Sequence, residues 1–174
     1  AINFNLEYFD VGLKIFMGIS AIFSFTGISF GLGGKILKVA EKMISKDDFN
    51  TRIIYEISET AHLYLQGNWK LIKRYDDDLV NKNLNIGEIY DAWQYMYWHG
   101  FQKIFNGSLK ITESIVTRLG ELHEIFGNNF LLLIKYELRV NLLIESRNLQ
   151  EALIEVNAAI EFAQKTNYNL FYSQ

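Results

Sequence analysis

The chain has 174 residues, enough for one ordinary domain, and its net charge of −3 gives no electrostatic reason to expect nucleic-acid binding, which requires a basic surface. It contains no cysteine and no proline, so disulfide scaffolds, Cys-ligated metals and cysteine nucleophiles are excluded, and every turn must be made by Gly, Asn, Asp or Ser. Apolar residues make up 49% of the chain and aromatic residues 15%, which excludes a disordered tail. Because the chain begins with Ala1 and ends in an apolar run over 169–174, we expect it to be part of a larger protein.

Turn-forming residues recur every twenty positions. Five of the eight marks counted from Gly27 are glycines, and two are Asp or Asn, which also tolerate the left-handed conformation that ends a helix. The marks fall on Gly27, Asp47, Gly67, Gly87, Gly107, Gly127, Arg147 and Asn167. Arg147 does not fit the pattern, although Asn148 lies beside it.

The segments between these marks have helical periodicity. In chain order, helices are expected over 8–26, after Gly27 around 36–44, over 51–66, over about 69–84, and then over 89–106, 109–126, 130–146 and 149–163. The last of these places Leu149, Ala152, Leu153 and Val156 on one face. Short links force neighbouring helices to pack antiparallel. We therefore predict an all-α fold of about four helix–turn–helix units with a forty-residue period, at approximately 8–46, 50–86, 89–127 and 130–168.

These units resemble tetratricopeptide (TPR) repeats, which have a small residue in the first helix, Gly at the turn seven positions later, and small residues five and twelve positions after that turn. The matching pairs are Gly100 with Gly107, Ser20 with Gly27, Thr60 with Gly67, and, in the second helix, Ala152 with Ala159. The sequence departs from the family at Leu32, Ile72 and Thr112, lacks the closing Pro, and exceeds the usual period of thirty-four. It looks like the long, degenerate repeats of multidomain signalling ATPases, nucleotide cyclases and transcription activators.

The resemblance implies a single TPR-like domain over residues 1–174, folded as a right-handed α-solenoid whose first helices line the inner surface. It further implies a non-enzymatic, cytoplasmic scaffold of a larger signalling or regulatory protein that binds a protein or peptide partner, or alternatively a small effector, with no cofactor. The apolar first repeat would favour a homodimer or a missing neighbouring repeat.

The densest group of large rings lies over 90–101. Helical spacing puts Trp93, Tyr97 and Phe101 on one face, so Tyr95, Trp98 and His99 point elsewhere. One interpretation is that all of them pack between neighbouring helices of the solenoid. The functional alternative is an aromatic wall on the concave side, and the candidate partner-binding residues are then Tyr95, Trp98 and His99.

Other patterns carry less functional information. Residues 15–34 are uncharged and long enough to span a bilayer, which leaves a membrane-anchored regulatory domain as the alternative, but Gly27 and Gly31 favour a buried repeat broken at Gly27. The Asp76, Asp77 and Asp78 run reads as a solvated helix face, with Asp76 paired to Lys73 or Arg74. The three histidines lack metal-ligand spacing, so we expect no metal site. The remaining alternative is an enzyme that uses the aromatic residues as a substrate site, although no nucleophile motif or phosphate-binding loop is present.

Overall fold

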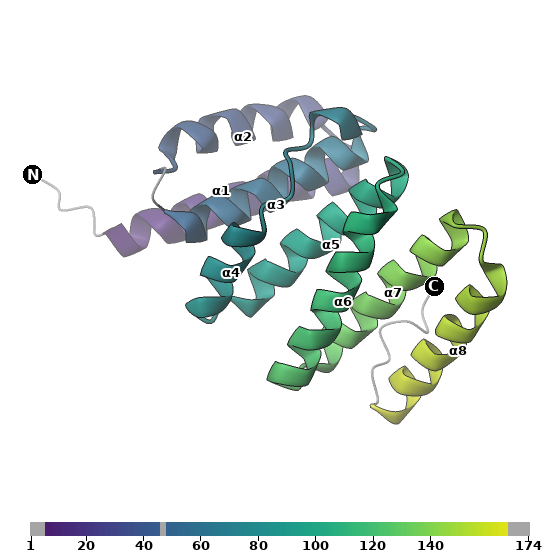
Figure 1. Cartoon of the computed structure of the whole chain (residues 1–174). Helices are drawn as coiled ribbons and strands as arrows, with labels where there is room; N and C mark the ends of the chain where they lie inside the picture. Colours follow the sequence, from purple (N-terminus) through teal and green to yellow (C-terminus); the bar gives the residue numbers. More distant parts are fainter. Residues whose placement is uncertain (1–5, 46–47, 167–174) are drawn as a thin grey trace, which may run out of the picture. The chain divides into compact units, whose positions relative to one another are not determined.

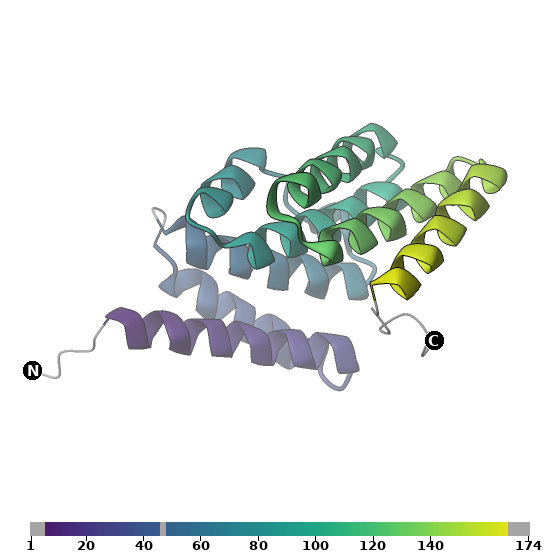
Figure 2. The same ribbon diagram turned by 90° about the horizontal axis from the view of Figure 1, so that it is seen from below.

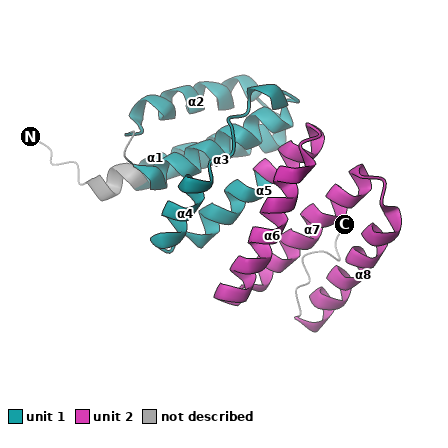
Figure 3. Ribbon diagram, viewed as in Figure 1, with its two compact units in different colours: residues 1–98 teal, residues 99–174 magenta. Residues whose placement is uncertain are grey.

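The computed structural model describes residues 6–45 and 48–166, with side chains from Val11 onward. Within these residues it contains eight α-helices, one short 3-10 helix and no strand, so the predicted all-α class is confirmed (Figure 1). The chain divides into two compact units, residues 1–98 and 99–174 (Figure 3).

Unit 1 contains α1 (Leu6–Thr26), α2 (Phe30–Met43), α3 (Phe49–Leu65), the 3-10 helix η1 (Trp69–Leu71), α4 (Asp77–Asn85) and residues 89–98 of α5 (Ile89–Phe105). Polar side chains cap these helices: Ser29 accepts a hydrogen bond from the Leu32 amide, and Asp48 accepts one from the Thr51 amide. Helix α3 packs on both α1 and α2 (Figure 2). The helix that follows the first pair therefore covers it.

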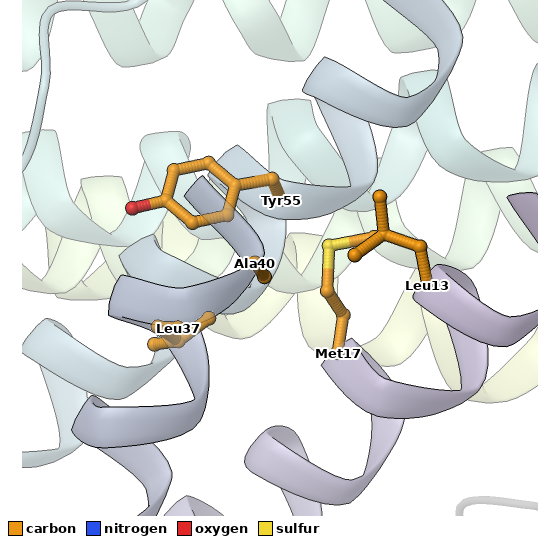
Figure 4. Close-up of a cluster of buried hydrophobic side chains, with 5 residues drawn as sticks. All are labelled: Leu13, Met17, Leu37, Ala40 and Tyr55. Carbon is orange, nitrogen blue, oxygen red and sulfur yellow. The ribbon is translucent and has the colours of Figure 1, made fainter. Parts of the chain in front are cut away.

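The core between these three helices is a small apolar cluster. Leu13 and Met17 come from α1, Leu37 and Ala40 from α2, and Tyr55 from α3 (Figure 4). All five side chains are buried. Because Ala40 has only a methyl group, the Tyr55 ring can pack close to α2.

Two glycines near the start of α2, Gly33 and Gly34, serve helix packing. A Cβ atom on Gly33 would lie 3.3 Å from the Ser20 carbonyl oxygen, and one on Gly34 would lie 3.2 Å from Nε2 of His62. The buried His62 ring is hydrogen bonded to Ser24 Oγ at 2.7 Å and to the side-chain Nε2 of Gln66 at 2.9 Å. Gly33 and Gly34 thus allow α2 to approach α1 and His62.

Unit 2 contains residues 99–105 of α5, then α6 (Leu109–Phe126), α7 (Asn129–Glu145) and α8 (Leu149–Lys165). Helix α7 packs on α6 and α8. It also meets the end of α5, where a Cβ atom on Gly100 would lie 2.9 Å from Cδ1 of the fully buried Leu138. The Thr112 hydroxyl of α6 donates to the Gly100 carbonyl at 3.1 Å. A small residue at position 100 is therefore required by packing.

The twenty-residue pattern marks the ends of helices. All five glycines of the pattern have positive φ, and Arg147 has a φ of 61°, alone among the described residues that are not glycine. Residues 67, 87, 107 and 147 share one hydrogen-bond arrangement. The amide of each residue donates to the carbonyl three positions earlier in the chain. The amide of the residue after it donates to the carbonyl five positions before that donor. Arg147 therefore fits the pattern after all. Asp47 and Asn167 lie outside the described residues.

The expected helix over about 69–84 was wrong in its first half. After η1, Ile72 is extended, with φ −63° and ψ 130°, and Asp76 is extended as the N-cap of α4. The Asp76 carboxylate accepts from the Leu79 amide at 3.1 Å, and Asp77 and Asp78 occupy the first turn, where the helix dipole favours negative charge. The acidic run therefore starts a helix.

Residues 15–34 do not form one continuous helix. Helix α1 ends at Thr26, Gly27 adopts a φ of 66°, and α2 begins at Phe30, as the interpretation of a repeat broken at Gly27 predicts. Among the described helices, none combines the length and apolar character that a bilayer crossing demands.

Candidate functional site

A groove of about 370 Å³ lies in unit 1, between α1, α3 and the first part of α5. Each helix contributes residues three or four positions apart, which places them on one helical face. From α1 come Lys14, Gly18, Ala21 and Phe25, and from α3 come Ile54, Ile57, Ser58 and Ala61. The groove is therefore built from one face each of α1, α3 and the first part of α5.

Small residues line two sides of the groove, so little side-chain volume stands above the helix backbones there. Gly18 and Ala21 of α1 lie on one side, and Ser58 and Ala61 of α3 lie on the other. No atom lies within 4 Å of a Cβ placed on Gly18, so this position is open. The helical spacing of these small residues on both helices is readable in the sequence and is a signal for the groove beyond the aromatic residues.

Aromatic rings form the third side. Trp98 lies with its ring centroid 5.7 Å from that of Phe25, and 5.6 Å from those of Tyr64 and Tyr97. Tyr90 packs edge-on against Trp93 at 5.1 Å. Phe25 and Tyr90 remain 57% and 62% exposed. Such rings offer rigid apolar area, and the indole N–H and phenol groups add hydrogen-bonding capacity.

Two opposite charges also line the groove, Lys14 on α1 and Asp91 on α5. Burial raises the pKa of Asp91, and the neighbouring Glu88 raises it further, whereas Lys14 opposes the shift. A partly desolvated carboxylate is stabilised in its charged form when a cationic group of a ligand binds to it, because the ion pair compensates for the water contacts that burial removes. The groove thus combines apolar surface with one acidic contact point.

Of the three predicted partner-binding residues, only Trp98 lines the groove. Tyr95 is fully buried on another face of α5, where its hydroxyl lies 3.2 Å from Glu56 Oε2 and accepts from the Asp76 amide at 3.1 Å. The Tyr95 ring stacks on Tyr75 at 5.6 Å. In this conformation Tyr95 cannot touch a partner, and its contacts join α3 to the segment before α4.

Arg52, whose side chain is 41% exposed, extends this network toward the surface. Its guanidinium donates to Glu56 at 2.9 Å and to Asp76 at 3.0 Å, so the expected pairing of Asp76 with Lys73 or Arg74 is corrected to Arg52. Lys73 instead pairs with Glu59 at 2.9 Å. Arg52 lies on α3, 24 residues before Asp76, so helical spacing within one segment could not identify it.

His99, the third predicted residue, is fully buried in unit 2. Burial lowers its pKa to about 3, and the positive charge of Lys103 adds to the shift. The ring is therefore neutral near pH 7 and is out of reach of a partner in this conformation. In the described part of the chain, no three His, Cys, Asp or Glu side chains are grouped so that they could hold a metal ion.

Comparison with known proteins gives no relative for this chain. No family model, no curated protein and no solved structure matches it. A function for the chain therefore rests on the chemistry of the groove in unit 1.

Proposed function

We propose that the chain is a non-enzymatic, TPR-like repeat domain of a larger signalling or regulatory protein, and that it binds a protein or peptide partner in the groove between α1, α3 and α5. The observation that carries this proposal is the groove itself, which joins exposed aromatic rings, small residues and one acidic side chain. Interfaces favour aromatic anchors that fill such surfaces.

The packing of the small TPR-like positions supports the repeat assignment. Ser20 is buried and its hydroxyl donates to the Gly33 carbonyl at 2.9 Å, and the Gly100 carbonyl accepts from Thr112. In each case a small residue of the first helix meets the second helix of the same pair. Continuing this arrangement through four units as a right-handed solenoid is part of the proposal.

The groove also suggests the chemistry of the partner. A segment with one or two apolar side chains and a neighbouring Lys or Arg would match the rings of Phe25, Tyr90 and Trp98 and the carboxylate of Asp91. Lys14 discourages a second positive charge at the α1 side of the groove. We therefore expect a mixed apolar and basic peptide.

The test uses a phage-displayed random peptide library selected on the whole chain. Peptides enriched on it should lose about tenfold or more in affinity when Phe25 and Tyr90 are changed to Ala, because each change removes exposed groove surface without opening a core. Trp98→Ala should weaken binding as well, and its circular dichroism spectrum reports whether the fold is kept.

The matched control is Ile125→Ala, which removes a side chain that is 67% exposed and does not line the groove. It should leave peptide affinity unchanged. Enriched peptides that bind the Phe25→Ala/Tyr90→Ala variant as well as the parent chain would refute the groove as the binding site, and so would a selection that enriches no peptide.

A further inference from the structure

Unit 2 has a second groove, between α7 and α8, which the proposed function does not use. This α7–α8 groove has a volume of about 230 Å³. Leu133 and Tyr136 of α7 and Val156 and Ile160 of α8 line it. Of the described residues that line it, Glu137 is the one that carries a charge. Because exposed apolar surface is stabilised when an apolar segment covers it, the groove is a candidate docking surface.

Helix α1, which lies along one edge of unit 1, has an apolar face exposed to solvent (Figure 2). Four side chains that are 40–62% exposed form one stripe along it: Val11, Ile15, Ile19 and Ile22. This α1 stripe lies about 200° around the helix from the buried Leu13. It lies about 90° from residues 14, 18, 21 and 25, which line the groove of the proposed function. The stripe is therefore separate from both the core and the proposed peptide site.

The stripe corresponds to the face with which later helices contact the pair before them. Helices α1, α3, α5 and α7 are followed by the left-handed residues 27, 67, 107 and 147, so Ile15 corresponds to residues 55, 95 and 135. Tyr55 packs in the core of the α1–α2 pair, and the Tyr95 hydroxyl is hydrogen bonded to a carboxylate of α3. Lys135 lies against α6, with its Cδ 3.5 Å from a Cβ atom placed on Gly120. By its position, Ile15 thus belongs to a face that packs on a helix pair.

The α7–α8 groove corresponds to the surface that α3 covers in unit 1. Its lining residues 133, 136, 137 and 160 lie three forty-residue periods after four residues of unit 1, namely Leu13, Phe16, Met17 and Ala40. These four belong to the core cluster that includes Tyr55 or pack against it. Helix α3 covers them, since it packs on both α1 and α2. A helix with an apolar stripe would cover the α7–α8 groove in the same way.

We propose that the α1 stripe of a second copy of this chain docks in the α7–α8 groove, as α3 docks on the α1–α2 pair. The correspondence also brings opposite charges together. Lys14 of α1 corresponds to Ile54 of α3, which packs against the core cluster of unit 1. Glu137 of the groove corresponds to Met17 of that cluster. An ion pair between two copies thus takes the place of an apolar contact within unit 1. Between residues 15 and 26 the chain has no charge that would oppose burial.

The two docking surfaces differ, so the contact between copies is heterologous. A pair of copies keeps one unused stripe and one unused groove, and longer assemblies therefore form as the concentration rises. An isologous contact, in which two α1 helices pack on each other, would instead stop at two copies.

The test uses complementary variants of the full chain in sedimentation equilibrium. Ile15→Asp alters the stripe and Ile160→Asp alters the groove, and each should weaken self-association about tenfold or more. An equimolar mixture should regain association and stop at two copies, because the intact groove of the first variant accepts the intact stripe of the second. The matched control is Ile154→Asp, a position on α8 that is 67% exposed and does not line the groove. It should associate as the parent chain does, and circular dichroism reports whether each variant is folded.

A second measurement tests the correspondence of positions. Lys14→Glu and Glu137→Lys should each weaken self-association several-fold, and a chain with both changes should regain the affinity of the parent chain. A double variant that associates no more tightly than the single variants would overturn the proposal. Unchanged self-association of Ile160→Asp would also overturn it, and would indicate that two α1 helices pack together. So would a parent chain that stays monomeric, the result expected if only a neighbouring repeat or a different protein covers the groove.

Discussion

Arg147 has the left-handed backbone conformation that glycines adopt at residues 27, 67, 87, 107 and 127, and replacing it with Gly should stabilise unit 2. Its φ is 61°, and its hydrogen bonds match those of Gly107, from the Arg147 amide to the Ile144 carbonyl at 3.0 Å and from the Asn148 amide to the Leu143 carbonyl at 2.8 Å. The Arg147 side chain is exposed. The substitution therefore changes the backbone preference and little packing.

The expected size follows from two opposing terms. A left-handed conformation costs an L-residue about 1–2 kcal/mol, a cost that glycine avoids. Glycine also loses about 0.4–1 kcal/mol more on folding, because its unfolded chain is freer. The net gain for Arg147→Gly is about 0.5–1 kcal/mol, which raises Tm by about 1–4 °C in a chain of this size.

The assay is urea unfolding followed by circular dichroism, with hydrogen exchange of α7 and α8 amides to locate the effect. Arg147→Ala is the control, since it removes the same side chain but keeps the left-handed cost. The reverse substitution, Gly107→Ala, should destabilise unit 2 by about 1 kcal/mol, because alanine must adopt the left-handed conformation of this position. No packing cost is added, since nothing lies within 4 Å of the new Cβ atom. If Arg147→Gly is no more stable than Arg147→Ala, the assignment of backbone strain at Arg147 is refuted.

Two further predictions concern buried histidine and the exposed face of α1. Since the folded pKa of His99 is about 3 and lies below its unfolded value of about 6.5, its contribution to stability is complete above pH 6.5 and is lost as pH falls toward 3. Unit 2 should lose about 2 kcal/mol between pH 7 and pH 5 in urea unfolding, and a His99 ring signal that titrates near pH 6.5 by NMR would contradict this. Along α1, Val11, Ile15, Ile19 and Ile22 are each at least 40% exposed and spaced three or four residues apart, an apolar face that either a second copy or a neighbouring repeat would cover; we predict the homodimer. Sedimentation equilibrium should show self-association that Ile15→Asp/Ile22→Asp abolishes, and a parent chain that stays monomeric at high concentration would rule it out.

The helices were predictable because glycine and helical periodicity act locally. A residue in the left-handed conformation, such as Gly67 or Gly107, ends a helix through its own backbone. The twenty-residue spacing of such glycines therefore predicts where helices end. Periodicity does not predict the break before α4, because the apolar spacing continues through Ile72. The break arises because the Asp76 side chain accepts a hydrogen bond from the Leu79 amide and thereby caps the start of α4. Periodicity alone does not report this competition between a side chain and the helix backbone.

The site was only partly predictable, because helical angles give relative directions and do not say which face is buried. The spacing correctly separated Tyr95 from Tyr97, but it did not show that Tyr95 would meet Glu56 from α3 while Trp98 joined the groove. That outcome depends on Arg52 and Asp76, which are distant in sequence. The small residues Gly18, Ala21, Ser58 and Ala61 were the stronger signal for the groove, since their helical spacing is readable without a structure.

Four helices, α3, α5, α7 and α8, have 17 residues each, and they begin at residues 49, 89, 129 and 149. Each is about 25 Å long, so the faces that one helix offers to the next are matched in length. Under the repeat arrangement proposed above, we expect a change in chain length to be best tolerated in whole blocks of forty residues, the spacing between the starts of α3, α5 and α7. A single residue inserted within a helix would instead rotate the rest of that helix by about 100° and turn its buried face toward solvent.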